Sequence, residues 1–364
     1  MADRKDLEYA PDYAVPPGET LLETIDALGM TQADLAARTG RTLKTINEII
    51  KGKAPIRPET ALQLERVLGI PASFWNNRDC NYREALARLE EKDRLKSQVR
   101  WLRELPVRPM VKLGWIRGFK DKVRQLQELL NFFGVASPDQ WRELWGGREV
   151  AFRKSPAFES NPGAVAAWLR KGEVDANRLR CAPYDESKFR AALHKIRALT
   201  VETPEIFHSA LVRLCAAAGV AVIFTPELPG TRVSGATRWL SPEKALIQLS
   251  LRYKTNDHLW FTFFHEAGHI LLHGKRDVFL ETDTIDDGKE KEANRFASNV
   301  LIPPGEYHKF IERGTKNESG IIHFAERLGI APGIVVGRLQ HDGILPQSYF
   351  NDLKIRLVLA PRSA

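Results

Sequence analysis

The chain has 364 residues, of which 43% are hydrophobic, and its formal net charge is +8. This length suits two or three domains, each large enough to bury its own core. The sequence contains no visible secretion signal, no apolar run of membrane-spanning length and no Gly-rich phosphate loop. We therefore expect a cytoplasmic protein without a membrane partner, and the isolated Cys80, Cys181 and Cys215 fit buried thiols in a reducing compartment.

The first predicted element is a pair of short helices around a glycine turn. Residues 31–40 and 41–50 both show helical apolar spacing, and Gly40 lies at their junction. This arrangement is typical of a helix-turn-helix within an all-α domain, which we place at residues 1–80. The apolar side chains expected to pack the two helices together are Leu35, Ala36, Ile46 and Ile49.

Polar residues of this helix pair are candidates for contact with double-stranded operator DNA. In the major groove, Lys44 would reach guanine acceptors and Asn47 an adenine edge. Residues 38–57 hold six basic residues and one acidic residue, although residues 1–80 together have a net charge of −2. The alternative is a small helical domain that binds protein. The predicted DNA-contacting residues are Gln32, Arg38, Arg41, Thr42, Lys44, Thr45, Asn47 and Lys51, of which Gln32, Arg38, Arg41 and Lys51 would face phosphates.

Residues 16–84 resemble the XRE-type helix-turn-helix domain of HigA-like antitoxins. The segment 62–70 and the pair Phe74-Trp75 match the later helices of that domain. The resemblance implies a DNA-binding regulator or antitoxin. Because helix-turn-helix proteins usually read paired half-sites as dimers, homodimer formation is an open expectation.

The middle region, residues 81–200, looks helical and basic, with 25 basic and 15 acidic residues. One long charged helix is predicted from Tyr82 to Leu105. After it, Gly and Pro pairs that include Gly146-Gly147 and Pro162-Gly163 are expected to interrupt the helices. There are two interpretations of this positive charge. It either extends a surface that binds nucleic acid or an acidic partner, or it only keeps long helices solvated. The tryptophans expected to anchor the core are Trp101, Trp115, Trp141, Trp145 and Trp168.

A metal-site pattern lies in the last region, residues 201–364. His265 and His269 are one helical turn apart, so both imidazoles can bind one Zn²⁺. Glu266 would be the general base that takes the proton of the attacking water. The surrounding helix is apolar nearly all round and therefore buried, with Asn256 or Asp257 as its cap and Gly274 as its end.

A third metal ligand is expected on the next helix. Glu290 falls within the apolar stripe of that helix, whereas Glu292 falls on its flank. We favour Glu290, with Glu292 as the alternative, and Asn294 could hydrogen-bond a ligand. His273, one turn beyond His269, is expected near the helix end as a structural group or a group that supports a ligand.

Residues 201–345 resemble the ImmA/IrrE family of metallo-endopeptidases, through residues 265–274, 290–297 and 301–303. The resemblance implies a gluzincin-like α+β zinc peptidase domain with a small antiparallel sheet, whose known substrates are bacterial repressor proteins. Strands are expected near residues 220–224 and 245–249. Residues 233–240 are the candidate for the edge strand that a substrate chain can join in zinc peptidases of this kind. The helical pattern at residues 319–340 is interpreted as packing for this domain.

The predicted fold class is α+β and mostly helical. Our first functional hypothesis is a DNA-binding transcriptional regulator with a zinc endopeptidase domain that cleaves a partner protein, such as a repressor or toxin-system component. The alternative is a non-proteolytic HigA-like antitoxin or repressor whose metal domain is a sensor or scaffold. A third hypothesis is a repressor that cleaves its own linker near residues 146–163.

Overall fold

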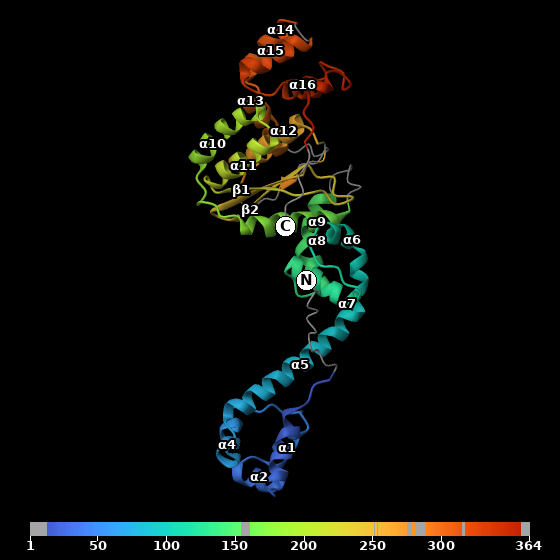
Figure 1. Cartoon of the computed structure of the whole chain (residues 1–364), viewed down its shortest axis with the longest axis vertical. Coiled ribbons are helices and arrows are strands. Elements are labelled where there is room, and N and C mark those ends of the chain that lie inside the picture. Colours follow the sequence, from blue (N-terminus) through green and yellow to red (C-terminus); the bar gives the residue numbers. More distant parts are fainter. Residues whose placement is uncertain are drawn as a thin grey trace, which may run out of the picture. The chain divides into compact units, whose positions relative to one another are not determined.

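The computed structural model describes residues 13–153, 161–250, 252, 254–274, 279–280, 288–314 and 317–357. It divides into two compact units (Figure 1). The first runs to Arg100 and includes Asp121–Val123, and the second comprises Trp101–Lys120 and the chain from Arg124. Helices dominate both units and the described strands all belong to the second, which confirms the predicted mostly helical α+β class.

The first unit is all-helical and has its own core. Gly18 packs so closely on the backbone of Ile50 that any side chain there would clash. All four apolar residues predicted to join the helix pair lie in this core, and Trp75 is fully buried beside them. Its helices are α1 (Pro17–Ala27), α2 (Gln32–Thr39), α3 (Leu43–Ile50), α4 (Pro58–Leu68) and α5 (Ala72–Gln98).

Local contacts fix the turn between α2 and α3. Gly40 has φ 66°, a left-handed conformation that favours glycine. Thr31 and Asp34 form a capping box at the start of α2, and the Thr42 hydroxyl accepts a hydrogen bond from the Thr45 N–H at the start of α3. The two predicted helices are therefore confirmed.

The predicted long helix at residues 82–105 is present but shifted. It belongs to α5, which begins at Ala72 and continues as the 3₁₀ helix η1 (Val99–Arg103). The helix therefore runs across residue 80. Downstream, α8 continues through residues 146–147, so the glycine pair predicted as a break lies within a helix, and residues 154–160 of the segment 146–163 lie outside the described residues.

The remaining helices lie on both sides of the strand region in the sequence. Four of the five predicted tryptophan anchors are buried, and Trp115 is half-buried. These helices are α6 (Val107–Lys112), α7 (Lys122–Phe133), α8 (Pro138–Arg153), α9 (Pro162–Arg178), α10 (Glu186–Ala198), η2 (Leu199–Val201), α11 (Pro204–Ala216), α12 (Asn256–Leu272), α13 (Gly288–Leu301), α14 (Pro304–Glu312), α15 (Glu318–Leu328), α16 (Pro332–His341) and η3 (Asn351–Leu353).

The described sheet has the order β1-β3-β2-β4 (Figure 1). Its strands are β1 (Val220–Phe224), β2 (Gly235–Ser241), β3 (Lys244–Leu249) and β4 (Phe279–Leu280). The hairpin of β2 and β3 is antiparallel, but β1 pairs with β3 in parallel, so the sheet is mixed and the prediction of an antiparallel sheet was wrong in this respect. The reason is strand order, since β1 lies beside β3 and not beside β2, its neighbour in sequence.

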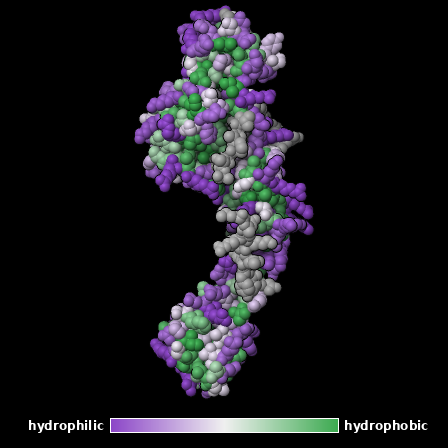
Figure 2. Space-filling view, viewed as in Figure 1, coloured by the Kyte–Doolittle hydropathy of each residue, from purple (hydrophilic) through white to green (hydrophobic). Residues whose placement is uncertain are grey.

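Helix α12 packs on β2 and β3, and α13 and α16 pack on α12. The predicted packing role of residues 319–340 agrees with this arrangement, because Phe324 of α15 and Val335 of α16 belong to the same core as α12. Hydrophilic residues make up much of the surface of the second unit visible in Figure 2. Among the described residues no single helix is long and apolar enough to cross a membrane, although the bent pair α15 and α16 passes on length and composition.

Candidate metal centre

The helix α12 is buried as predicted, but its ends are held differently. Its N-cap residue is Thr255, not Asn256 or Asp257, and its C-cap residue is His273, one residue before Gly274. Asn256 accepts hydrogen bonds from the N–H groups of Asp257 and Ile355, while Asp257 forms an ion pair with Lys354. Both expected caps therefore bind the C-terminal segment.

The side chains of His265, His269 and Glu290 converge at the contact between α12 and α13. Their ligand atoms all lie within 4.8 Å of one another. The Nε2 atoms of the two histidines are 3.0 Å apart, and the carboxylate oxygens of Glu290 lie 3.1 Å from Nε2 of His265 and 3.4 Å from Nε2 of His269. Two imidazoles and a carboxylate form a donor set that could hold a metal ion.

Close approach of the two helices makes this convergence possible. A Cβ atom at Gly268 of α12 would lie 3.2 Å from the Cα atom of Ala293 and 3.2 Å from the Phe296 ring on α13. Ala293 is itself fully buried. Small residues at the crossing therefore bring Glu290, one turn before Asn294, to the histidine face of α12.

Other polar groups orient the two histidines through their second ring nitrogens. Nδ1 of His265 is 2.9 Å from Oδ1 of Asn294, the neighbour that the sequence suggested. Nδ1 of His269 is 2.9 Å from Nδ1 of His273, whose Nε2 is 3.2 Å from Oε2 of Glu292. Such contacts fix the tautomer and ring orientation of a histidine ligand. Glu292 thus connects to the cluster through His273, whereas Glu290 is a member of the cluster.

Glu266 follows the cluster residue His265 on α12 and is fully buried. Its backbone carbonyl accepts a hydrogen bond of 3.1 Å from the Thr237 hydroxyl of β2. A Cβ atom at Gly235 would lie 2.6 Å from Oε1 of Glu266, so this position gives room to the carboxylate. Sequence analysis missed this role of Gly235, because only the pairing of β2 beside α12 reveals it.

The ionisation states reflect the crowded geometry. Burial lowers the pKa of His269, and the neighbouring His265 and His273 lower it further against the attraction of Glu290. Burial alone would raise the pKa of Glu290, but hydrogen bonds from His265 and His269 lower it to about 2. The lowered pKa of His269 favours its neutral imidazole and that of Glu290 favours its ionised carboxylate, the protonation states that metal binding requires.

The predicted DNA-contacting residues lie along α2 and α3, at their caps and, for Arg41, in the turn between them. Lys44 has 84% of its side chain exposed and lies 3.9 Å from Glu48. Arg41 donates to the side chain of Gln63, and Thr42 and Thr45 share a hydroxyl hydrogen bond at the start of α3. The exposed members of the set are Arg38, Thr42, Lys44 and Lys51, and the half-buried members are Gln32, Arg41, Thr45 and Asn47.

Comparison with known families assigns both regions. Residues 21–75 match the helix-turn-helix family model, and residues 215–340 match the model of the IrrE N-terminal-like domain, a peptidase family. The chain joins a helix-turn-helix domain to an IrrE N-terminal-like domain. The IrrE N-terminal-like match includes His265, His269 and Glu290, and both resemblances noted in the sequence are confirmed.

Among the solved structures similar to this chain are two that cover about a fifth of it, the helix-turn-helix part. A Pseudomonas aeruginosa protein in complex with its operator DNA is 29% identical over 21% of this chain and 82% of that chain, with a TM-score of 0.20. An addiction module antidote protein of the HigA family from Coxiella burnetii is 26% identical over 23% of this chain and 92% of that chain, with a TM-score of 0.22. No match was found among curated proteins.

Proposed function

We propose that the protein is a DNA-binding transcriptional regulator whose IrrE N-terminal-like domain is a zinc-dependent endopeptidase that cleaves a partner protein. The observation that carries this proposal is the convergence of His265, His269 and Glu290 within 4.8 Å, with Glu266 buried beside them. A repressor or a toxin-system component is the proposed substrate, by analogy with the resembled family. Because the proposed ligand is operator DNA, we propose that the protein acts in the cytoplasm.

The residues of the cluster fit Zn²⁺. Two imidazole nitrogens and one carboxylate are a ligand set known from catalytic zinc sites, which keep a further position open. Bound Zn²⁺ would supply a Lewis acid that polarises a carbonyl group and makes water a nucleophile near neutral pH. Asn294 and His273 would hold the two imidazoles in position.

Glu266 has the role of general base in this proposal. It is the residue after His265 on the buried face of α12, and a carboxylate there can take a proton from water and return it to the departing amine. Gly235 of β2 leaves room for this carboxylate, and the Thr237 hydroxyl of β2 donates a hydrogen bond to the backbone carbonyl of Glu266. Glu266 therefore acts on protons and need not bind the metal.

The test combines metal content with proteolysis. Elemental analysis of the purified protein should find about one zinc per chain, and His265→Ala and Glu290→Ala should lose most of it. Glu266→Gln should keep zinc but abolish cleavage of a partner protein, which can be found by co-purification with this variant. The absence of zinc from the wild type, purified from zinc-supplemented medium, would reject the peptidase.

Cleavage experiments also separate the three hypotheses. A partner protein shortened by the wild type and not by Glu266→Gln supports the proposed endopeptidase. Fragments of the chain itself that disappear with the same substitution support cleavage of its own linker instead. Zinc and DNA binding without any proteolysis would leave an antitoxin or repressor whose metal domain is a scaffold.

A further inference from the structure

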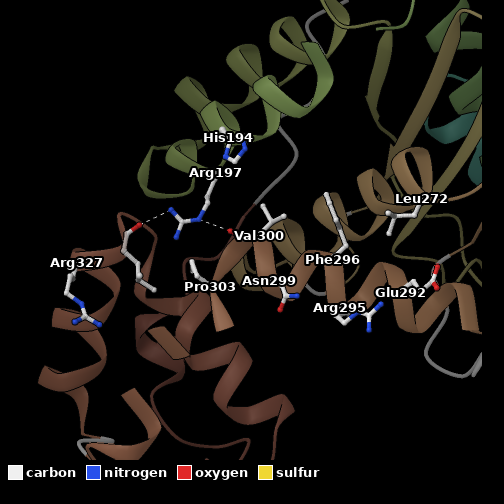
Figure 3. A pocket seen from close by; sticks show the side chains of 11 residues that line it. His194, Arg197, Leu272, Glu292, Arg295, Phe296, Asn299, Val300, Pro303 and Arg327 are labelled. Carbon is white, nitrogen blue, oxygen red and sulfur yellow. Dashed lines mark hydrogen bonds between the residues drawn. The ribbon is translucent and has the colours of Figure 1, made fainter. Parts of the chain in front are cut away.

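A cavity of about 840 Å³ lies on the side of α13 that faces α10 and α15. Figure 3 shows His194 and Arg197 of α10 across from Phe296 and Val300 of α13. This volume is within the range of about 300–1,000 Å³ typical of sites for organic ligands. Neither family resemblance nor the proposed peptidase chemistry uses this cavity.

The walls of the cavity combine apolar and cationic side chains. Leu272 at the end of α12 is 44% exposed, and Phe296, Val300, Pro303 and Leu328 extend the apolar surface. Arg197, Arg295 and Arg327 add positive charge, against which Glu292 is the single carboxylate among the described residues of the lining.

The three arginines differ in what they already bind. Arg197 donates to the backbone carbonyls of Val300, Leu301 and Leu328, so it neutralises the ends of α13 and α15. Arg327 lies 2.9 Å from Glu306. Arg295 is exposed, and the part of the chain that the structure describes gives it no ion pair. Arg295 is therefore the cation available to a ligand.

We propose that this cavity binds a small organic anion that has an apolar body, and that its occupancy acts on the metal centre through Glu292. The anionic group would pair with Arg295, and the apolar body would cover Phe296, Leu272 and Pro303. A site with one charged anchor and apolar walls orients such a ligand and gains affinity from burial of its apolar surface. An inorganic anion has no apolar surface to bury and would therefore interact with the charged anchor alone.

The connection to the metal centre is a chain of three side chains. Glu292 lines the cavity and is 3.2 Å from His273, which in turn is 2.9 Å from His269. An anion beside Arg295 repels the Glu292 carboxylate, which weakens its contact with His273 and the support of His269. This connection depends on the metal site proposed above, whereas anion binding in the cavity does not.

Binding is tested with 8-anilinonaphthalene-1-sulfonate, an aromatic sulfonate whose fluorescence rises in apolar sites. The uncharged N-phenyl-1-naphthylamine, which has the same rings, is the matched probe. The wild type should bind the sulfonate more tightly, and Arg295→Gln should weaken sulfonate binding by about tenfold, the effect of one charge-assisted hydrogen bond, without weakening binding of the uncharged probe. Glu292→Gln should tighten sulfonate binding because it removes a like charge.

The control is Arg213→Gln, which removes an exposed arginine on α11 that does not line this cavity. Equal sulfonate affinity in Arg295→Gln, Arg213→Gln and the wild type overturns the proposal, as does equal affinity for both probes. If Arg295→Gln fails to fold by circular dichroism, Arg295→Met replaces it and should weaken sulfonate binding to the same extent.

Zinc affinity measured against a competing chelator tests the connection. Saturating sulfonate should lower the zinc affinity of the wild type by up to about tenfold, and zinc should lower sulfonate affinity by the same factor. Glu292→Gln should abolish this mutual effect. Sulfonate binding without any effect on zinc overturns the connection. A protein that binds no zinc rejects the metal site and the connection, while binding of the two probes still decides the cavity.

Discussion

Two carboxylates on α13, only two residues apart, have different surroundings. Glu290 is 14% exposed and lies within 3.4 Å of both histidines, whereas Glu292 is 53% exposed and lies beside His273. The helical wheel predicted this difference, because Glu290 is in the apolar stripe. The wheel could not predict the link from Glu292 to His269, since that link depends on where His273 lies at the end of α12.

Substitution of each carboxylate should distinguish a metal ligand from a supporting residue. Glu290→Gln should lose most zinc affinity, since one of three protein ligands loses its charge. Glu292→Gln should lower the zinc affinity by about tenfold, the usual effect of removing a residue that supports a metal ligand. Chelator competition measures both. A larger loss in Glu292→Gln than in Glu290→Gln would identify Glu292 as the third ligand.

Gly235→Ala is expected to displace Glu266 and so to lower catalytic activity. The added methyl group would lie 2.6 Å from Oε1 of Glu266 and 2.6 Å from Cγ2 of Thr262, so both side chains must shift. A displaced base lowers the rate by up to about a hundredfold, since a 1 Å misplacement has that effect. The measurement is peptide hydrolysis together with zinc content, which should stay unchanged. Gly274→Ala, at a position with no neighbour within 4 Å among the described residues, is the control. Equal loss in both variants would contradict this role of Gly235.

At the scale of elements, an ion pair joins α9 to the sheet. Glu173 lies 2.8 Å from Arg238 of β2 and 2.9 Å from Arg170. Burial alone would raise the pKa of Glu173, but the two arginines lower it below its usual value of 4.5. A lowered pKa in the folded state means that the carboxylate stabilises the fold above about pH 4.5, and that this contribution is lost as the pH falls through the folded pKa.

Glu173→Gln should therefore lower stability at pH 7 by about 1 kcal/mol, allowing for partial exposure of the side chain. The difference from the wild type should shrink as the pH falls below 4.5. Denaturant unfolding at pH 7 and in acid measures both values. Glu186→Gln removes an exposed ion pair with Arg190 on α10 and should change stability little at either pH. If the stability difference between Glu173→Gln and the wild type grows in acid, the Glu173 carboxylate does not stabilise the fold in the way argued above.

Local patterns predicted the elements well, but not their long-range partners. The turn at Gly40 and the helix that carries His265 follow from spacing and from residues nearby in sequence. Asn256 and Asp257 look like caps, yet they bind Ile355 and Lys354, about 100 residues away. The parallel pairing of β1 with β3 and the contact of Gly235 with Glu266 likewise depend on tertiary packing.

On the scale of the whole molecule, part of the basic charge of the middle region is paired with nearby acids. Arg88 pairs with Glu84 and Lys96 with Asp93 on α5, and Arg142 pairs with Glu104 and Asp139. These pairs favour the interpretation that the charge of the middle region solvates long helices over the interpretation that it forms a second nucleic-acid surface. The segment 38–57, by contrast, has six basic residues and Glu48 as its single acid.

The two interpretations of the basic charge predict different salt dependences of DNA binding. Lys51→Ala should lower affinity for all DNA sequences alike and reduce the slope of log affinity against log salt by about 0.9, the value for one phosphate contact. Arg88→Gln should leave that slope unchanged if the middle region does not contact DNA. The measurement is fluorescence anisotropy at several salt concentrations, with an operator selected from random duplexes.

Lys44→Ala provides the sequence-specific comparison. It should cost about 1–3 kcal/mol on the selected operator and relax the preference at one base pair, because the side chain is expected to contact guanine. Its effect should be far smaller on unrelated DNA. If Arg88→Gln reduces the slope as much as Lys51→Ala, the DNA footprint extends onto α5. If Lys44→Ala weakens all duplexes equally, Lys44 contacts a phosphate and base recognition belongs to other residues of α3.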